Sequence, residues 1–266
     1  MKRRRGCYGA CWNSETAAPD NAEGFPVGHG VTRTAAGELN PPRHITRLTT
    51  NSEGRQSMVS AREAFERLQE GNLRFASHVR GSDVFLSHPR RVELPTDQHP
   101  FAIILGCSDA RVPAEIVFDQ GLGDLFVIRV AGNIVAPSQV GSVEFAAARF
   151  GTRLVVVLGH SQCGAIVATL EELRMPTENQ SRNLRAIVDR VRPSVEGLLA
   201  TDLRHDSDAL VEQAVRANIR VSVNHLRHGS QVLEQLIQDG GLLVVGAEYS
   251  LETGVVDFFD GAPEPI

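Results

Sequence analysis

The stretch FAIILGCSDAR at residues 101–111 indicates both the fold and the chemistry of this chain. Its first half, residues 101–105, is a continuous apolar run, which is typical of a strand buried on both faces of a parallel sheet. Cys107, Asp109 and Arg111 follow directly, so one short loop carries a soft ligand, an acid and a cation. The sequence therefore predicts a buried strand whose carboxyl end opens into a reactive loop.

A second apolar run, residues 154–158, ends in the same way, in the ligand-bearing stretch GHSQC at residues 159–163. Apolar runs alternate with helical patterns, and we expect strands at 101–106, 125–130, 154–159, 242–247 and about 254–259. This alternation predicts an α/β fold: a single domain with a central, mostly parallel β-sheet flanked by α-helices. Such sheets bind ligands at the carboxyl ends of their strands, where both motifs stand.

Helices are expected before and between these strands. The first, an N-terminal helical arm, begins after Ser60, which has the spacing of a capping box to Glu63. Gly71 is expected to interrupt or divide that helix, and Pro193 to mark a break after a helix at 183–191. The remaining helices are expected at 114–119, 139–150, 163–173, 208–228 and 230–238.

Residues 1–57 have a different composition, rich in Gly, Pro, Thr, Asn and Ala and with little periodic apolar pattern. We predict that they form a disordered N-terminal extension ahead of a folded domain at 58–266. Cys7 and Cys11 lie in this extension without partner ligands at metal-site spacing, so we interpret them as incidental. The basic start of the chain has no apolar segment behind it and is not typical of a signal peptide.

The composition excludes several classes of function. A net charge of -5 and a pI of about 6.0 give no electrostatic reason to expect a nucleic-acid partner. No apolar run approaches the roughly 20 residues that cross a bilayer, so no membrane association is expected. Four cysteines in a chain of 266 residues do not make a disulfide scaffold. We predict a cytoplasmic location, where reduced thiols suit metal binding.

Cys107, His160 and Cys163 form a candidate metal site. Alone, a cysteine at a strand end is usually a small buried residue, and a neighbouring histidine is usually hydrogen-bonded in the core. Together, after two buried strands, two thiolates and one imidazole are a ligand set suited to zinc. Three protein ligands leave one coordination position open, as catalytic zinc sites do. The sequence therefore predicts a reaction centre.

Asp109 and Arg111 stand two residues apart in the same loop and are expected to pair, which keeps the carboxylate ionised. A zinc ion with an open position supplies a hydroxide nucleophile near neutral pH. Asp109 is expected to accept a hydrogen bond from that hydroxide and so orient it. In a closed state, Asp109 would instead swing in as a fourth zinc ligand and exclude water.

The motifs CSDARV at 107–112 and GHSQCG at 159–164 resemble those of the β-class carbonic anhydrases, and the likeness covers roughly residues 60–260. The resemblance implies that 58–266 is a β-carbonic-anhydrase-like zinc domain holding one Zn2+ per chain through Cys107, His160 and Cys163. It implies reversible hydration of carbon dioxide to bicarbonate and a proton, with Asp109 and Arg111 as the catalytic dyad. It also implies a homodimer or homotetramer with the active site near a subunit boundary.

The same resemblance implies a substrate pocket. Gln98 matches a glutamine that hydrogen-bonds substrate, and Phe126 matches an aromatic wall of the pocket. Ala131 stands where valine is common, and Phe145 stands where many members have tyrosine. A small apolar pocket suits carbon dioxide, which offers few hydrogen-bonding handles.

Three other functions remain as alternatives. The same fold and ligands can hydrolyse carbon disulfide or carbonyl sulfide. A non-catalytic protein that binds zinc or bicarbonate would require a defective dyad, yet Asp109 and Arg111 are both present. A dinucleotide-binding domain is disfavoured, because Gly121 and Gly123 lack the rest of the glycine fingerprint and precede a strand.

Overall fold

The computed structural model describes residues 59–77, 98–176 and 181–264, which belong to one compact unit, Gly54–Ile266. The extension predicted at 1–57 lies outside the described residues and stays a prediction. None of the helices in the described part of the chain is both long enough and apolar enough to pass through a membrane.

Five strands form one sheet in the order β2-β1-β3-β4-β5. They are β1 (Ala102–Gly106), β2 (Leu125–Arg129), β3 (Leu154–His160), β4 (Leu243–Tyr249) and β5 (Val256–Asp260). The first four are mutually parallel, and β5 returns antiparallel to β4. The predicted mostly parallel sheet is therefore confirmed, with β1 and β3 as neighbours at its centre.

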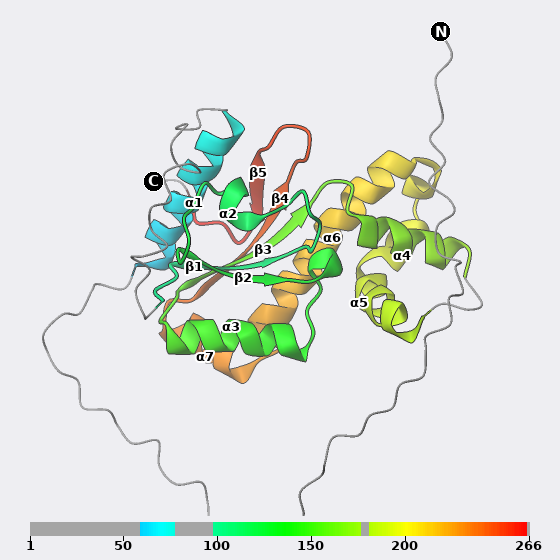
Figure 1. Cartoon of the computed structure of the whole chain (residues 1–266). Helices are drawn as coiled ribbons and strands as arrows, with labels where there is room; N and C mark the ends of the chain where they lie inside the picture. The colour runs from blue at the N-terminus through cyan, green and yellow to red at the C-terminus, as the bar shows by residue number, and fades with distance from the viewer. Residues whose placement is uncertain (1–58, 78–97, 177–180, 265–266) are drawn as a thin grey trace, which may run out of the picture. The chain divides into compact units, whose positions relative to one another are not determined.

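The helices cover both faces of this sheet. They are α1 (Ala61–Ala76), α2 (Ala114–Val117), α3 (Pro137–Arg149), α4 (Gly164–Arg174), α5 (Arg182–Leu199), α6 (Ser207–His228) and α7 (Gln231–Asp239), with short 3-10 turns η2 (Ala131–Asn133) and η3 (Asp202–His205). Figure 1 shows α1 and α2 on one side of the sheet and α3 and α7 on the other.

Alternation along the central strands explains these two layers. Ile103 and Leu105 pack into the core formed with α3, α4, α5, α6 and α7. Ile104, between them, packs into the core formed with α1 and α2. Successive side chains of a strand point to opposite faces, so a strand covered on both faces is apolar along nearly its whole length. Every residue of β1 and β3 is buried.

The predicted interruption at Gly71 is wrong, because α1 continues through it to Ala76. Ser60 does cap the helix, since its side chain accepts a hydrogen bond of 3.1 Å from the Glu63 amide. A Cβ atom at Gly71 would collide with the backbone carbonyl of Phe118, where α2 ends. The glycine therefore allows α1 and α2 to pack closely, although glycine lowers the intrinsic stability of a helix.

The predicted break at Pro193 is also wrong, because α5 runs through it to Leu199. Proline removes one helical hydrogen bond, here to the carbonyl of Asp189. Both residues are exposed, so water can reach that carbonyl. Val191 and Val195, on either side of Pro193, are fully buried and hold the helix against the core.

Candidate metal centre

The two motifs meet at the carboxyl ends of the adjacent strands β1 and β3. Cys107 follows β1, His160 ends β3, and Cys163 is the residue that caps α4. All three are buried, and their ligand atoms lie within 4.8 Å of one another. The predicted convergence of Cys107, His160 and Cys163 is therefore present in the fold.

The imidazole of His160 is oriented for metal binding. Its Nδ1 lies 2.9 Å from the Ser161 carbonyl oxygen and donates to it, which leaves the lone pair on Nε2. Nε2 is buried and has no hydrogen-bond partner among the described residues. A buried nitrogen without a partner is costly in a folded protein. A metal ion beside the two thiols would remove that cost.

The two sulfur atoms have a separation that fits zinc. Cys107 Sγ and Cys163 Sγ lie 3.9 Å apart. Two thiolates that bind one zinc ion at about 2.3 Å in a tetrahedral arrangement lie about 3.8 Å apart. The residues present therefore fit a tetrahedral metal ion.

The electrostatics of the two thiols also favour a cation. A hydrogen bond with Cys163 is the main reason that the pKa of Cys107 falls to about 4. The same hydrogen bond, with burial, raises the pKa of Cys163. The pair by itself therefore holds one negative charge, and a bound dication is needed before both sulfurs become thiolates.

Asp109 lies beside the ligands and is held by Arg111. The guanidinium donates from Nε to Oδ1 at 2.9 Å and from Nη2 to Oδ2 at 2.7 Å, and the Arg111 amide donates to Oδ1 at 2.9 Å. These hydrogen bonds hold the pKa of Asp109 well below its usual range. Its Oδ2 lies 3.8 Å from Nε2 of His160. An ionised acceptor thus borders the metal ligands.

Two residues outside the CSDARV and GHSQCG motifs shape this loop. Arg129, at the end of β2, donates to the carbonyl of Cys107 at 3.0 Å and to that of Asp109 at 2.5 Å. The amide of Gly132 lies 3.4 Å from Cys107 Sγ and donates to it. Both contacts join segments that are distant in the chain, so spacing could not reveal them.

Three of the four residues predicted to bind substrate lie at the opposite end of the strands. In the pairing of β1 with β2, Phe126 lies beside Ile103, which is four residues before Cys107. Four residues span about 13 Å along a strand. Phe145 packs on Phe126 with ring centroids 6.4 Å apart, and Gln98 precedes the amino end of β1. Within one chain these three do not reach the metal ligands. Ala131, in η2, does lie beside the metal ligands.

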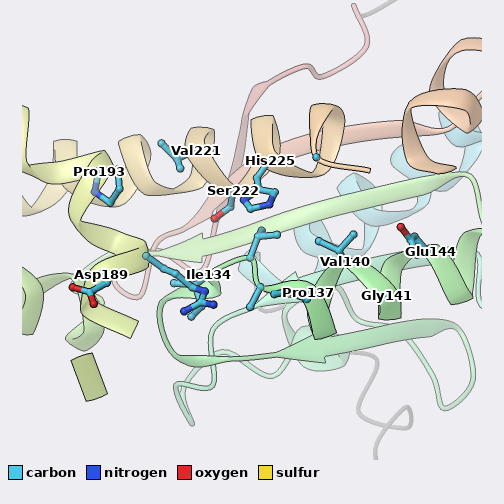
Figure 2. A pocket seen from close by; sticks show the side chains of 14 residues that line it. Ile134, Pro137, Val140, Gly141, Glu144, Asp189, Pro193, Val221, Ser222 and His225 are labelled. Carbon is cyan, nitrogen blue, oxygen red and sulfur yellow. The ribbon is translucent and has the colours of Figure 1, made fainter. Parts of the chain in front are cut away.

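A cavity of about 630 Å³ lies between α3, α5 and α6. Figure 2 shows Ser222 and His225 of α6 facing Ile134 and Pro137 across it. The described residues that line it include none of the ligands or dyad residues. The metal ligands and the dyad therefore lie at the ends of the strands and not in this cavity, although the cavity borders the segment that follows η2.

Comparison with known proteins agrees with this geometry. The carbonic anhydrase family model matches residues 102–256. Carbonic anhydrase 2 of Mycobacterium tuberculosis is 39% identical over 191 residues, which cover 72% of this chain and 89% of that protein. This chain belongs to the β-carbonic anhydrase family.

Solved β-carbonic anhydrases share the fold. CafA of Aspergillus fumigatus is 26% identical with a TM-score of 0.59, covering 71% of this chain and 89% of CafA. A tetrameric β-carbonic anhydrase of Sordaria macrospora is 22% identical with a TM-score of 0.58, covering 73% of this chain and 96% of that one. The resemblance and the α/β fold inferred from the sequence are therefore confirmed.

Proposed function

We propose that this chain, as a zinc enzyme, catalyses the reversible hydration of carbon dioxide to bicarbonate and a proton. One Zn2+ per chain would be held by Cys107, His160 and Cys163. The observation that supports this most directly is the convergence of two thiols and a partnerless imidazole nitrogen beside an ionised carboxylate. Membership in the family indicates the reaction, and the arrangement of these side chains provides a site where it can take place.

The protein's own groups have separate roles in this proposal. A zinc ion held by Cys107, His160 and Cys163 would supply Lewis acidity, which would activate water near neutral pH. Asp109 offers a fixed acceptor that orients the attacking oxygen, and Arg111 keeps that acceptor ionised and in place. Two thiolates give the metal more charge than imidazoles do, so the water should be less acidic than at a site of three histidines.

The test of this function is stopped-flow hydration of carbon dioxide, measured together with zinc content, at about pH 8.5, where the less acidic water of a thiolate site is ionised. We expect the rate to rise in proportion to zinc up to about one ion per chain and to vanish when a chelator removes the metal. Full zinc with sulfide release from carbon disulfide but no hydration would favour the hydrolase. Full zinc with neither reaction would favour a binding protein.

We further propose that Gln98, Phe126 and Phe145 complete the site of a partner subunit in a homodimer or homotetramer. They lie too far from the ligands of their own chain. The side chain of Phe145 is 54% exposed, although aromatic residues are usually covered. β2 forms an edge of the sheet in this chain, where a second copy can approach.

Mixed dimers test this arrangement. Cys107→Ala removes one zinc ligand from one chain and so disables its metal site, and the double variant Gln98→Ala/Phe126→Ala removes the substrate wall of the other. If the wall serves the partner, the mixed dimer keeps one intact site and about half of the wild-type hydration rate, by symmetry. If the wall serves its own chain, the mixed dimer has no intact site and is no faster than the two parent variants.

We also propose a cytoplasmic location, because thiol ligands persist in a reducing compartment. Cell fractionation checks it, and recovery of the protein outside the cytoplasm would contradict it.

A further inference from the structure

The turn η2 contacts the metal ligand Cys107 and has an unusual backbone conformation. Gly132 and Asn133 both have positive φ, 69° and 42°. Glycine adopts such a conformation freely and asparagine tolerates it better than most residues, so the two residue types permit this turn and hydrogen bonds from other elements restrain it. The buried Nδ2 of Asn133 has no hydrogen-bond partner in the described part of the chain and adds no restraint of its own.

The restraint comes from α6, on which Asn218 and Ser222 lie one turn apart. Asn218 Nδ2 donates to the Gly132 carbonyl at 2.8 Å, and Ser222 Oγ donates to the Asn133 carbonyl at 3.0 Å. The two donors are buried, with exposures of 2% and 3%. Ser194 Oγ of α5, which donates to the Val191 carbonyl at 2.5 Å, also lies 3.4 Å from Asn218 Oδ1. Two consecutive carbonyls of η2 are thus held by one helix face.

A backbone amide of this turn points toward the metal ligands. The amide of Gly132, whose carbonyl Asn218 holds, donates to Cys107 Sγ at 3.4 Å. Gly132 also has little room for a side chain, since a Cβ atom there would lie 3.1 Å from Cβ of Ala165, next to the N-terminus of α4. The position of this amide therefore depends on α6.

We propose that Asn218 and Ser222 are positioning residues that hold the Gly132 amide on the Cys107 sulfur and thereby set the affinity of the site for zinc. The inference deepens the proposed function, because it rests on the same metal site. A hydrogen bond to a ligand sulfur stabilises the thiolate that binds the metal and fixes its direction. Loss of such an outer contact typically weakens metal binding about 10–100-fold.

Figure 2 shows why Ser222 is the gentler position to change. Its side chain lies at the wall of the cavity between α3, α5 and α6, close to Ile134. Ser222→Ala removes one hydroxyl and adds no bulk. Asn218→Ala removes a larger buried group and is expected to lower stability as well.

Asn72 provides the matched control. It is a buried asparagine whose Nδ2 donates to the carbonyls of Val117 and Gly254 at 3.1 and 2.9 Å, on the α1 side of the sheet. Asn72→Ala therefore removes a comparable bridge between distant segments without touching η2. It separates a general loss of stability from an effect on the metal site.

The experiment measures zinc affinity by competition with a chromophoric chelator, and the thiolate-to-cobalt charge-transfer band of Co2+-loaded protein, for the wild type and three variants. For Ser222→Ala and Asn218→Ala we expect about 10-fold or greater loss of zinc affinity and a band moved to lower energy. For Asn72→Ala we expect lower thermal stability with unchanged zinc affinity and an unchanged band.

Unchanged zinc affinity and band in both α6 variants would overturn the inference and leave Asn218 and Ser222 as packing residues only. An equal loss of affinity in Asn72→Ala would also overturn it. These measurements do not need catalysis. A protein that binds zinc as expected but does not hydrate carbon dioxide would contradict the proposed function alone.

Discussion

Cys107→Ala is expected to abolish both zinc binding and carbon dioxide hydration. Cys107 supplies one of the two sulfurs, and the remaining pair, His160 and Cys163, is too small a set to retain the ion against a chelator. The loss should reach the uncatalysed rate, because each proposed step depends on the metal. Metal analysis and stopped-flow hydration on the same purified sample measure both losses.

Cysteines outside the described residues provide the control. Cys7→Ala and Cys11→Ala remove a thiol from the segment that the sequence separates from the zinc domain. We expect full zinc and full hydration in both. Zinc that persists in Cys107→Ala at one ion per chain would show that the ligand set is wrong.

Asp109→Asn is expected to keep zinc and to lower the rate of hydration by about 100-fold, the usual cost of losing a preorganised polar group at a reacting centre. The amide keeps the size of the carboxylate but removes its charge and one of its two acceptors. Arg111 then holds a neutral side chain whose NH2 group can face the attacking oxygen. The kcat for hydration and the zinc content, measured together, separate this effect from loss of metal.

Asp119 provides an aspartate of similar chemistry outside the site. It pairs with Arg74 at 2.6 Å near the contact between α1 and α2. Asp119→Asn should therefore leave hydration unchanged. A full rate in Asp109→Asn would remove the carboxylate from the mechanism. A parallel loss of zinc would instead point to Asp109 as a ligand, the alternative closed state that the sequence leaves open.

The central strands could be predicted because a strand covered on both faces is apolar along nearly its whole length. Residues 101–106 and 154–159 were expected as strands, and the structure has Ala102–Gly106 and Leu154–His160. The cysteine and histidine ligands could be recognised because they interrupt these apolar patterns. Cys107, His160 and Cys163 break two apolar runs where parallel strands end, and such ends share one edge of the sheet.

The errors at Gly71 and Pro193 show the limit of local rules. Both residues weaken a helix by themselves. Whether the helix continues depends on what packs against it: a close approach to Phe118 in one case, and the burial of Val191 and Val195 in the other. Phe118 lies on another element, and the two valines lie on the buried face of the same helix. Helix propensity describes neither of these contacts.

By itself the sequence determined the α/β class, the convergence of Cys107, His160 and Cys163 and the Asp109–Arg111 pair, because each is carried by neighbouring residues or by a strand end. Only the tertiary structure decided how Arg129 and Asn218 hold the metal loop and η2, and that Gln98 lies at the far end of β1 from the ligands. The physical reason is that hydrogen bonds between distant segments leave no periodic pattern in the chain. They exist only once burial has brought those segments together.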